Sequence, residues 1–221
     1  GIQSAGTNTK KIFKRPHSNK RVFHATNIAN RFKHKVRAKY DVIIDSPWET
    51  DQDQIETLMF LAKIKTPWLL NLFSLTFYPG TTLYTKAKKE GIITDDLNEV
   101  YRKSFHGYRK TYLNALFFML KDYVEIGLGI HPKVMFMLTN RSMMKLRLHK
   151  ALFIFLKKIF IVAYPILRAK RLMQLSFNDI KEGDWTRIKR HLKRKNIFSG
   201  LFSPQRSGSN IDLKPEESIT N

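Results

Sequence analysis

Polar side chains follow three apolar segments in the first half of the chain. They are Gln3 and Ser4 after the first segment, Asp45, Ser46, Glu49 and Thr50 after the second, and Ser74, Thr76, Pro79, Gly80 and Thr81 in and after the third. Amide, carboxylate and hydroxyl groups of this kind can hold a polar ligand by hydrogen bonds. If the segments are parallel strands, their carboxyl ends meet at one edge, where such domains bind ligands. The residue types alone predict a ligand site in an α/β domain.

The elements that must position these groups alternate along the chain. Residues 1–4 read as the stub of a strand, and strand-like patterns cover residues 40–45 and 70–78. The continuous apolar run of residues 40–45 is typical of a buried parallel strand. Helical spacing follows each strand. Ser18 is a candidate N-cap for the first helix, the second follows Asp51, and the third begins at Thr81 or Thr82 and ends at Gly91. This alternation predicts βα units and a parallel sheet.

Three strands are too few to close a barrel or to make an open sheet with protected edges. We therefore expect an α/β fold: a partial (β/α) TIM-like barrel of about three parallel strands over residues 1–97, with further strands in a preceding part of the protein. A basic α-helical extension is expected over residues 98–200, and a Ser-, Pro- and Gly-rich disordered tail over residues 201–221.

The second half is expected to be helical and basic. Residues 101–126 read as one long helix, and Pro132 breaks the segment after it. The apolar run 151–167 is interrupted by Lys157, Lys158 and Pro165. A transmembrane helix needs about 20 apolar residues, so this run is too short and too charged to span a membrane. It fits an amphipathic helix that lies on a membrane surface or packs on the body of the protein.

Composition limits the classes of chemistry. The 221 residues include 40 Lys and Arg against 18 Asp and Glu, a formal net charge of +22, which favours nucleic acid, acidic lipid or phosphate-bearing ligands as partners unless the charge merely solvates the surface. No cysteine is present, so disulfides and thiolate metal sites are excluded. The seven histidines form no metal-binding pair, and we assign no metal. The absence of an RNP motif makes nucleic acid the weaker candidate.

Three sequence blocks together resemble the radical S-adenosylmethionine (radical SAM) superfamily. The block GIQSAG with KIFKRP is similar to the fourth barrel strand and its helix, DVIIDSPWET to the fifth strand, and LFSLTFYPGTTLY to the sixth strand and its exit. The resemblance covers residues 1–95 and is closest to the group in which a B12-binding (cobalamin) domain precedes the barrel. It implies that this chain is the carboxyl-terminal half of such a barrel.

The resemblance implies contacts to S-adenosylmethionine (SAM). Gln3 and Arg15 match polar contacts to the ribose and the methionyl carboxylate, and Asp41 matches an acid that contacts the ribose hydroxyls. Ile43 matches the apolar stretch beside the adenine, and Phe77 and Tyr78 lie where strand six passes the same ring. With the strand-end residues, the candidate cofactor-binding set is Gln3, Ser4, Arg15, Asp41, Ile43, Asp45, Phe77 and Tyr78. No catalytic residue is assigned.

The chain also departs from this family. The C-x-x-x-C-x-x-C motif that holds the [4Fe–4S] cluster is absent, so the cluster ligands and any cobalamin domain would lie outside this segment. Ala5-Gly6 also reverses the usual Gly-Ser order. We expect the whole protein to be an enzyme of the cytoplasm, associated with an acidic membrane surface if its basic segment binds lipid, that uses 5′-deoxyadenosyl-radical chemistry. The segment alone is expected to be inactive. The alternative is a non-catalytic, basic amphipathic module, based on residues 143–195, that binds a membrane surface or an anionic ligand.

Overall fold

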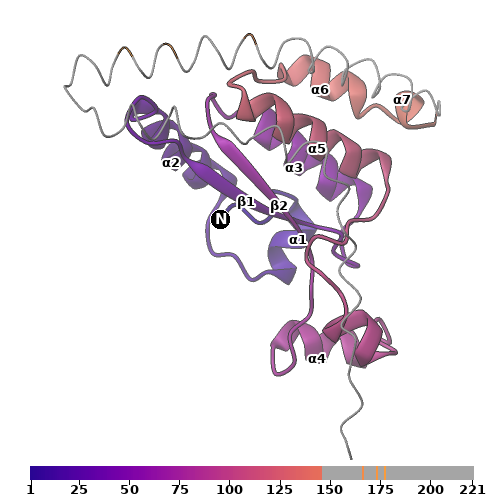
Figure 1. The fold of residues 1–221 in the computed structure, drawn as a ribbon. Helices are drawn as coiled ribbons and strands as arrows, with labels where there is room; N and C mark the ends of the chain where they lie inside the picture. The colour runs from indigo at the N-terminus through magenta and orange to yellow at the C-terminus, as the bar shows by residue number, and fades with distance from the viewer. Residues whose placement is uncertain (146–165, 167–172, 174–176, 178–221) are drawn as a thin grey trace, which may run out of the picture. The chain divides into compact units, whose positions relative to one another are not determined.

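The computed structural model describes residues 1–145, 166, 173 and 177 of the chain (Figure 1). The expected basic helices and tail beyond residue 145 therefore lie outside the described residues, apart from those three positions. The described elements, in chain order, are α1 (Thr7–Ile12), α2 (Asn19–Arg31), β1 (Lys39–Ile44), α3 (Asp51–Ala62), β2 (Leu69–Ser74), α4 (Thr82–Lys89), the π-helical turn η1 (Leu97–Tyr101), α5 (Tyr112–Glu125), α6 (Pro132–Leu138) and α7 (Arg141–Lys145).

The sheet has two parallel strands. β1 pairs with β2 in a register that runs from Lys39 opposite Leu69 to Ile44 opposite Ser74. The parallel arrangement predicted from the βα alternation is confirmed. The fold shown is mixed α/β with a two-stranded sheet and several helices, and a TIM-like barrel is not shown.

The expected first strand is reduced to a single bridge. Gln3 pairs in parallel with Val42 on the free side of β1. Its φ of 59° takes the backbone out of the extended region, and the chain turns at once into α1. Where about three strands were expected, the structure shows two strands and this bridge, and the expected strand stub over residues 1–4 does lie beside β1.

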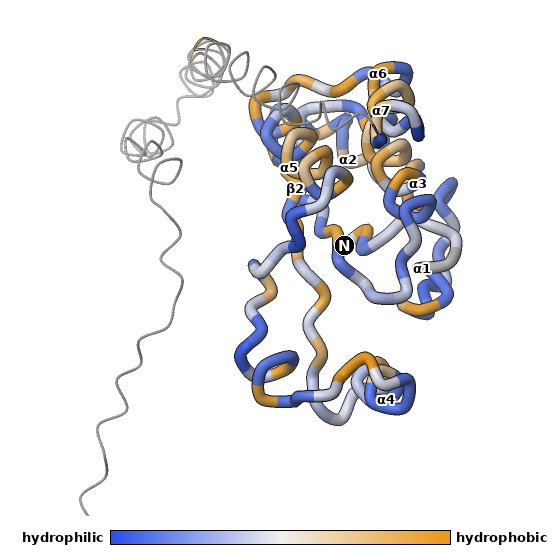
Figure 2. Tube along the Cα trace, turned by 90° about the vertical axis from the view of Figure 1, so that its right-hand side faces the viewer, coloured by the Kyte–Doolittle hydropathy of each residue, from blue (hydrophilic) through white to orange (hydrophobic). Residues whose placement is uncertain are grey.

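The main core lies between one face of the sheet and the helices α3 and α5. Val42 and Ile44 of β1 and Leu70 and Leu72 of β2 alternate with less buried neighbours and are themselves buried. They pack with apolar residues of both helices, among them Leu58, Leu61, Leu116, Phe117 and Leu120. Figure 2 shows the mainly apolar colour of α5 and α6. This burial orients the strands, since period-two alternation sends the other half of their side chains to the opposite face.

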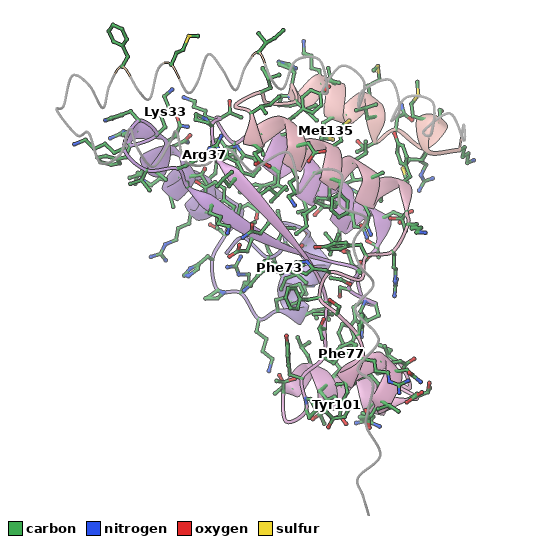
Figure 3. The ribbon with its side chains drawn as sticks, viewed as in Figure 1. Lys33, Arg37, Phe73, Phe77, Tyr101 and Met135 are labelled. Atoms are coloured by element: carbon green, nitrogen blue, oxygen red, sulfur yellow. The ribbon has the colours of Figure 1, made fainter. Side chains whose placement is uncertain are left out.

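A second, smaller core surrounds α4. Leu75, Phe77, Ala87, Ile93 and Val100 are buried together in the excursion between β2 and α5. The chain leaves the sheet after β2, forms α4 and η1, and returns to the sheet (Figure 1). This excursion places Phe77 and the exposed Tyr101 beyond the ends of the strands (Figure 3).

The long helix expected over residues 101–126 is shorter than predicted. α5 begins only at Tyr112, where the Thr111 side chain caps the helix by accepting from the Asn114 N–H at 3.1 Å. Tertiary bonds hold the preceding residues in a non-helical path. The Ser74 N–H donates to the Phe105 carbonyl, and the Tyr108 hydroxyl donates to the Leu72 carbonyl. Pro132, expected as a breaker, occupies the first turn of α6, where it leaves no helical hydrogen bond unmade.

Several local predictions are confirmed. Ser18 is the N-cap of α2, and its hydroxyl accepts from the Arg21 N–H. Thr81 caps α4 in the same way. Gly91 follows α4 with a φ of 69°, a value that glycine adopts without a steric penalty. Within the described residues, no helix is both long enough and apolar enough to span a membrane.

Gly6 lies directly against α3. A Cβ placed on Gly6 would come within 2.6 Å of the Asp53 Cβ and within 2.8 Å of the Asp53 Cα and carbonyl oxygen. The Gly6 N–H donates to the Ser4 and Thr57 hydroxyls, and the Ala5 N–H donates to the same Thr57 oxygen. The loop before α1 is therefore joined to α3 by close packing and by buried hydrogen bonds.

Candidate functional site

The candidate site is the sheet face that points away from α3 and α5. We call it the open face and define it by Asp41 and Ile43 of β1 and Asn71 and Phe73 of β2. All four side chains remain partly exposed. Asp41 stands opposite Asn71 and Ile43 opposite Phe73, so the face has one polar rung and one apolar rung. Figure 3 shows Phe73 close to the carboxyl end of β2.

The polar rung is an ordered hydrogen-bonded pair. The Asn71 amide donates from Nδ2 to Asp41 Oδ1 at 2.7 Å. Asp41 is therefore held in one orientation on the open face, and the described residues donate no hydrogen bond to its Oδ2. A carboxylate held in this way can accept hydrogen bonds from hydroxyl groups of a ligand.

The apolar rung provides a wall beside this acceptor. The Phe73 ring lies 5.9 Å from the Phe105 ring, and Ile43 packs against the small core around α4. A flat apolar group could rest on such a wall, because an aromatic ring and a branched aliphatic chain both offer dispersion contacts. The open face thus combines a hydrogen-bond acceptor, which suits the hydroxyl groups of a ribose, with an apolar wall, which suits a nucleobase.

Two of the predicted site residues, Asp41 and Ile43, share this face. Gln3, which was also predicted, is half-buried beside Val42 at the free side of β1. Its backbone accepts from the Ile43 N–H at 2.7 Å and so keeps the segment next to β1. These three residues are the part of the predicted set that the fold brings together.

Ser4 and Asp45 have structural roles in the described residues. Ser4 is buried, with its Oγ 3.2 Å from the Thr57 hydroxyl. Asp45, also buried, accepts from the Arg109 N–H at 3.1 Å and from the Asn114 side chain at 2.7 Å. One carboxylate oxygen of Asp45 thus accepts from the loop before α5, and the other accepts from the first turn of α5. Neither residue lies on the open face.

Arg15 is not on a helix, since α1 ends at Ile12. Its guanidinium donates to the backbone carbonyls of Gly1 and Ile2, which lie beside β1. Burial lowers the pKa of Arg15 from its ordinary value. The side chain thus stabilises the bridge segment instead of standing free for a ligand carboxylate.

Phe77 and Tyr78 separate after β2. Phe77 is buried in the small core, where its ring meets the Trp48 ring edge-on at a centroid distance of 5.9 Å. Tyr78 is 60% exposed. Phe77 borders the site through Ile43, which packs against the same core, whereas Tyr78 belongs to the turn before α4.

Comparisons with models of protein families, with curated proteins and with solved structures find no match to this chain. Among the described residues, no group of three or more His, Asp or Glu side chains is arranged to hold a metal ion. The chemistry of the site therefore rests on the geometry of the open face.

Sequence reasoning missed Asn71, and it named Glu49 only as one of several polar residues after the second strand, without including it in the candidate cofactor-binding set. Asn71 had a usable signal, because an amide in the middle of the apolar run LLNLFS needs a partner. Glu49 lies after β1, and its buried Oε2 finds no hydrogen-bond partner among the residues that the structure describes, as is also true of the Ser46 and Ser74 hydroxyls. Burial raises the pKa of Glu49 to about 8, although the Gln54 side chain lowers it, and the Asp53 and Asp45 carboxylates raise it further by smaller amounts.

The raised pKa of the half-buried Glu49 implies that the stability of the chain changes with pH. In the unfolded chain this carboxyl ionises near its ordinary pKa of 4.5, whereas in the folded chain it stays protonated up to about pH 8. Its stabilising contribution is complete below pH 4.5 and is lost as the pH rises to 8. Relative to Glu49→Gln, the native chain should lose about 2 kcal/mol of unfolding free energy between pH 5 and pH 8, below the full linkage value because the side chain is partly exposed.

Urea denaturation at pH 5, 6.5 and 8 measures this loss. The exposed Glu125 provides the control, and Glu125→Gln should leave the pH dependence unchanged. Parallel pH profiles for the native chain and Glu49→Gln would show that Glu49 ionises normally in the folded state.

Proposed function

We propose that the chain binds the nucleoside end of SAM on its open face, as part of a radical SAM enzyme. The observation that carries the proposal is the open face itself, with the acceptor Asp41 next to the apolar wall of Ile43 and Phe73 on adjacent parallel strands. Asp41 would accept from the ribose hydroxyls, and Ile43 and Phe73 would contact the adenine. The sequence blocks that resemble the radical SAM superfamily contribute these same residues.

The residues of this chain fit the nucleoside of SAM but do not fit the iron–sulfur cluster of that family. The open face fits a nucleoside, because its acceptor and its apolar wall are neighbours. The [4Fe–4S] cluster does not fit this chain, since clusters of this kind are held mainly by thiolates and the sequence contains no cysteine. The cluster, and cobalamin if it is used, would be held by residues outside the chain. The methionyl carboxylate would also need another partner, because Arg15 is engaged with backbone carbonyls.

The role of this chain would be binding and orientation. When bound, SAM would supply 5′-deoxyadenosyl-radical chemistry, for which the one-electron reductant, a [4Fe–4S] cluster, would be held outside this chain. Asp41, which Asn71 holds in one orientation, would set the rotation of the ribose. Ile43 and Phe73 would exclude water from one side of the adenine. Orientation of this kind contributes to catalysis by limiting the geometries from which the reaction can start.

Saturation-transfer NMR with SAM and with 5′-deoxyadenosine tests the proposal on the full chain, because it detects weak binding. We expect saturation of the adenine and ribose protons. Phe73→Ala should reduce the adenine signal, and Asp41→Asn should weaken binding about tenfold, as is typical when a hydrogen bond to a charged group is lost. Asp51→Asn is the matched control, since Asp51 is exposed in the first turn of α3. An absence of saturation at millimolar ligand, or equal losses in all three variants, would rule out a nucleoside site here.

The alternative of a non-catalytic basic module was based on residues 143–195. Almost all of that region lies outside the described residues. The described part of the chain offers a separate argument for an anionic partner, which uses other residues and another side of the sheet.

A further inference from the structure

An apolar stripe extends from the end of α2 into the loop before β1. Ile28, Phe32 and Val36 are spaced four residues apart, which places them on one side of a helical path. The Val36 N–H donates to the Phe32 carbonyl at 2.9 Å, so the helical spacing continues past the end of α2. The side chains are 43%, 54% and 67% exposed. Three large apolar side chains in a row facing solvent require a reason.

Basic residues surround this stripe. Residues 28–39 and 63–67 contain seven Lys and Arg and no Asp or Glu: Arg31, Lys33, Lys35, Arg37, Lys39, Lys63 and Lys65. Six of the seven are exposed, Arg37 being half-buried. We call the exposed side chains of residues 28–39 and 63–65 the amino-end surface. The name reflects its position, since the two segments lead into the amino ends of β1 and β2, opposite the end where polar residues follow the strands.

Hydrogen bonds hold the two segments of this surface together. The Asn30 side chain donates to the Lys65 carbonyl at 2.9 Å, and the Leu69 N–H donates to the Ala38 carbonyl at 2.9 Å. The Arg37 guanidinium donates to the Glu125 carbonyl at the end of α5. Figure 3 shows Lys33 and Arg37 near the end of α2. The backbone segments that carry the basic and apolar side chains are therefore tied to each other and to the sheet.

We propose that the amino-end surface binds the surface of an anionic lipid bilayer. Phe32, Val36 and Ile28 enter the boundary between headgroups and acyl chains, and the surrounding Lys and Arg side chains contact anionic headgroups. Each basic residue near such a surface contributes about 1 kcal/mol, and burial of the apolar side chains adds to this. The apolar stripe distinguishes a bilayer from nucleic acid, because aliphatic side chains such as Ile28 and Val36 gain little from phosphates and cannot stack on bases as aromatic rings do.

This inference goes beyond the proposed function and does not depend on it. The open face and the amino-end surface share no residues. Bilayer binding on this side leaves the carboxyl ends of the strands facing away from the lipid.

Vesicle co-sedimentation of the full chain tests the proposal, with phosphatidylcholine vesicles that contain either 30% phosphatidylserine or none. We expect binding to the anionic vesicles only, weakened by high salt. Lys33→Glu with Lys35→Glu should weaken it at least tenfold, because about 1 kcal/mol is lost for each basic residue removed. Phe32→Ser with Val36→Ser should also weaken it about tenfold and leave the electrostatic response to salt unchanged.

Matched controls separate this surface from net charge and from apolarity in general. Lys11→Glu with Lys14→Glu makes the same change in net charge near α1, and Leu97→Ser with Tyr101→Ser removes two exposed apolar side chains from η1. Both control pairs should bind as the native chain does. Circular dichroism of each variant confirms that it has folded.

Three results would overturn the proposal. The first is an absence of binding to anionic vesicles at low salt. The second is binding that all four variant pairs retain or lose equally. The third is tighter binding to a 20-nucleotide RNA that is lost in the lysine pair and unchanged in the Phe32 and Val36 pair, which would assign the surface to nucleic acid.

Discussion

Replacing Gly6 by alanine is expected to lower the free energy of unfolding by about 3 kcal/mol, at the upper end of what overpacking in a rigid environment costs. The new methyl group would lie 2.6 Å from the Asp53 Cβ and 2.8 Å from its Cα and carbonyl oxygen. Two of these three atoms are backbone, so no side-chain rotation relieves the clash. Separation of the loop from α3 would also strain the bonds from the Gly6 and Ala5 N–H groups to the Thr57 hydroxyl.

Chemical denaturation of Gly6→Ala measures this effect, and Gly129→Ala is the control. A Cβ on Gly129 would meet its nearest neighbour, the Thr66 Cγ2, at an ordinary contact distance of 3.5 Å. The control should change stability by less than about 0.5 kcal/mol, as surface substitutions usually do. Similar unfolding midpoints for the two variants would show that the loop before α1 can move away from α3 at little cost.

Asn114→Leu is the second substitution with a large expected effect, a loss of about 3 kcal/mol. The Asn114 side chain donates to Asp45 Oδ1 at 2.7 Å and to the Arg109 carbonyl at 2.8 Å, and it is itself buried. Leucine fills a similar volume but donates nothing. The buried Asp45 carboxylate would keep the single bond from the Arg109 N–H, and loss of a partner from a buried charge is among the costliest single changes.

A double-mutant cycle shows whether this cost comes from the Asp45 charge. Asp45→Asn removes the charge and keeps a residue that tolerates the observed φ of 63°. If the two side chains act as a pair, Asn114→Leu should destabilise the Asp45→Asn background by at least 1 kcal/mol less than it destabilises the native chain. Additive effects would show that the loss of stability in Asn114→Leu comes from packing or from the lost hydrogen bond to the Arg109 carbonyl.

The sequence was sufficient for the elements that local chemistry specifies. Ser18, Thr81 and Gly91 mark helix ends through hydrogen bonds or backbone angles that act within a few residues. The apolar run ending at Asp45 correctly indicated a strand, and the βα spacing correctly indicated parallel pairing. Prediction failed where distant contacts decide the conformation. Residues 102–110 are polar and aromatic enough to continue a helix, but Phe105 and Tyr108 bind β2 instead.

The candidate site was predictable in part, for the same reason. The resemblance named Asp41 and Ile43, and the period of a β-strand is enough to place both side chains on one face of the sheet. The strand pattern could not reveal that both carboxylate oxygens of Asp45, which follows β1, accept hydrogen bonds from Arg109 and Asn114. These partners lie 64 and 69 positions away in the sequence. Arg15 was misplaced because its carbonyl partners, Gly1 and Ile2, carry no side-chain signal.

The rung between Asp41 and Asn71 has a further consequence for how β1 and β2 align during folding. A slip of two residues would keep every side chain on its own face, so burial of the apolar core discriminates only weakly against it. Such a slip would set Asp41 opposite Leu69 or Phe73 and would break the hydrogen bond between the Asn71 amide and the Asp41 carboxylate. The hydrogen bond between these two side chains therefore favours the observed register of β1 and β2, and its loss should permit a mixture of strand registers.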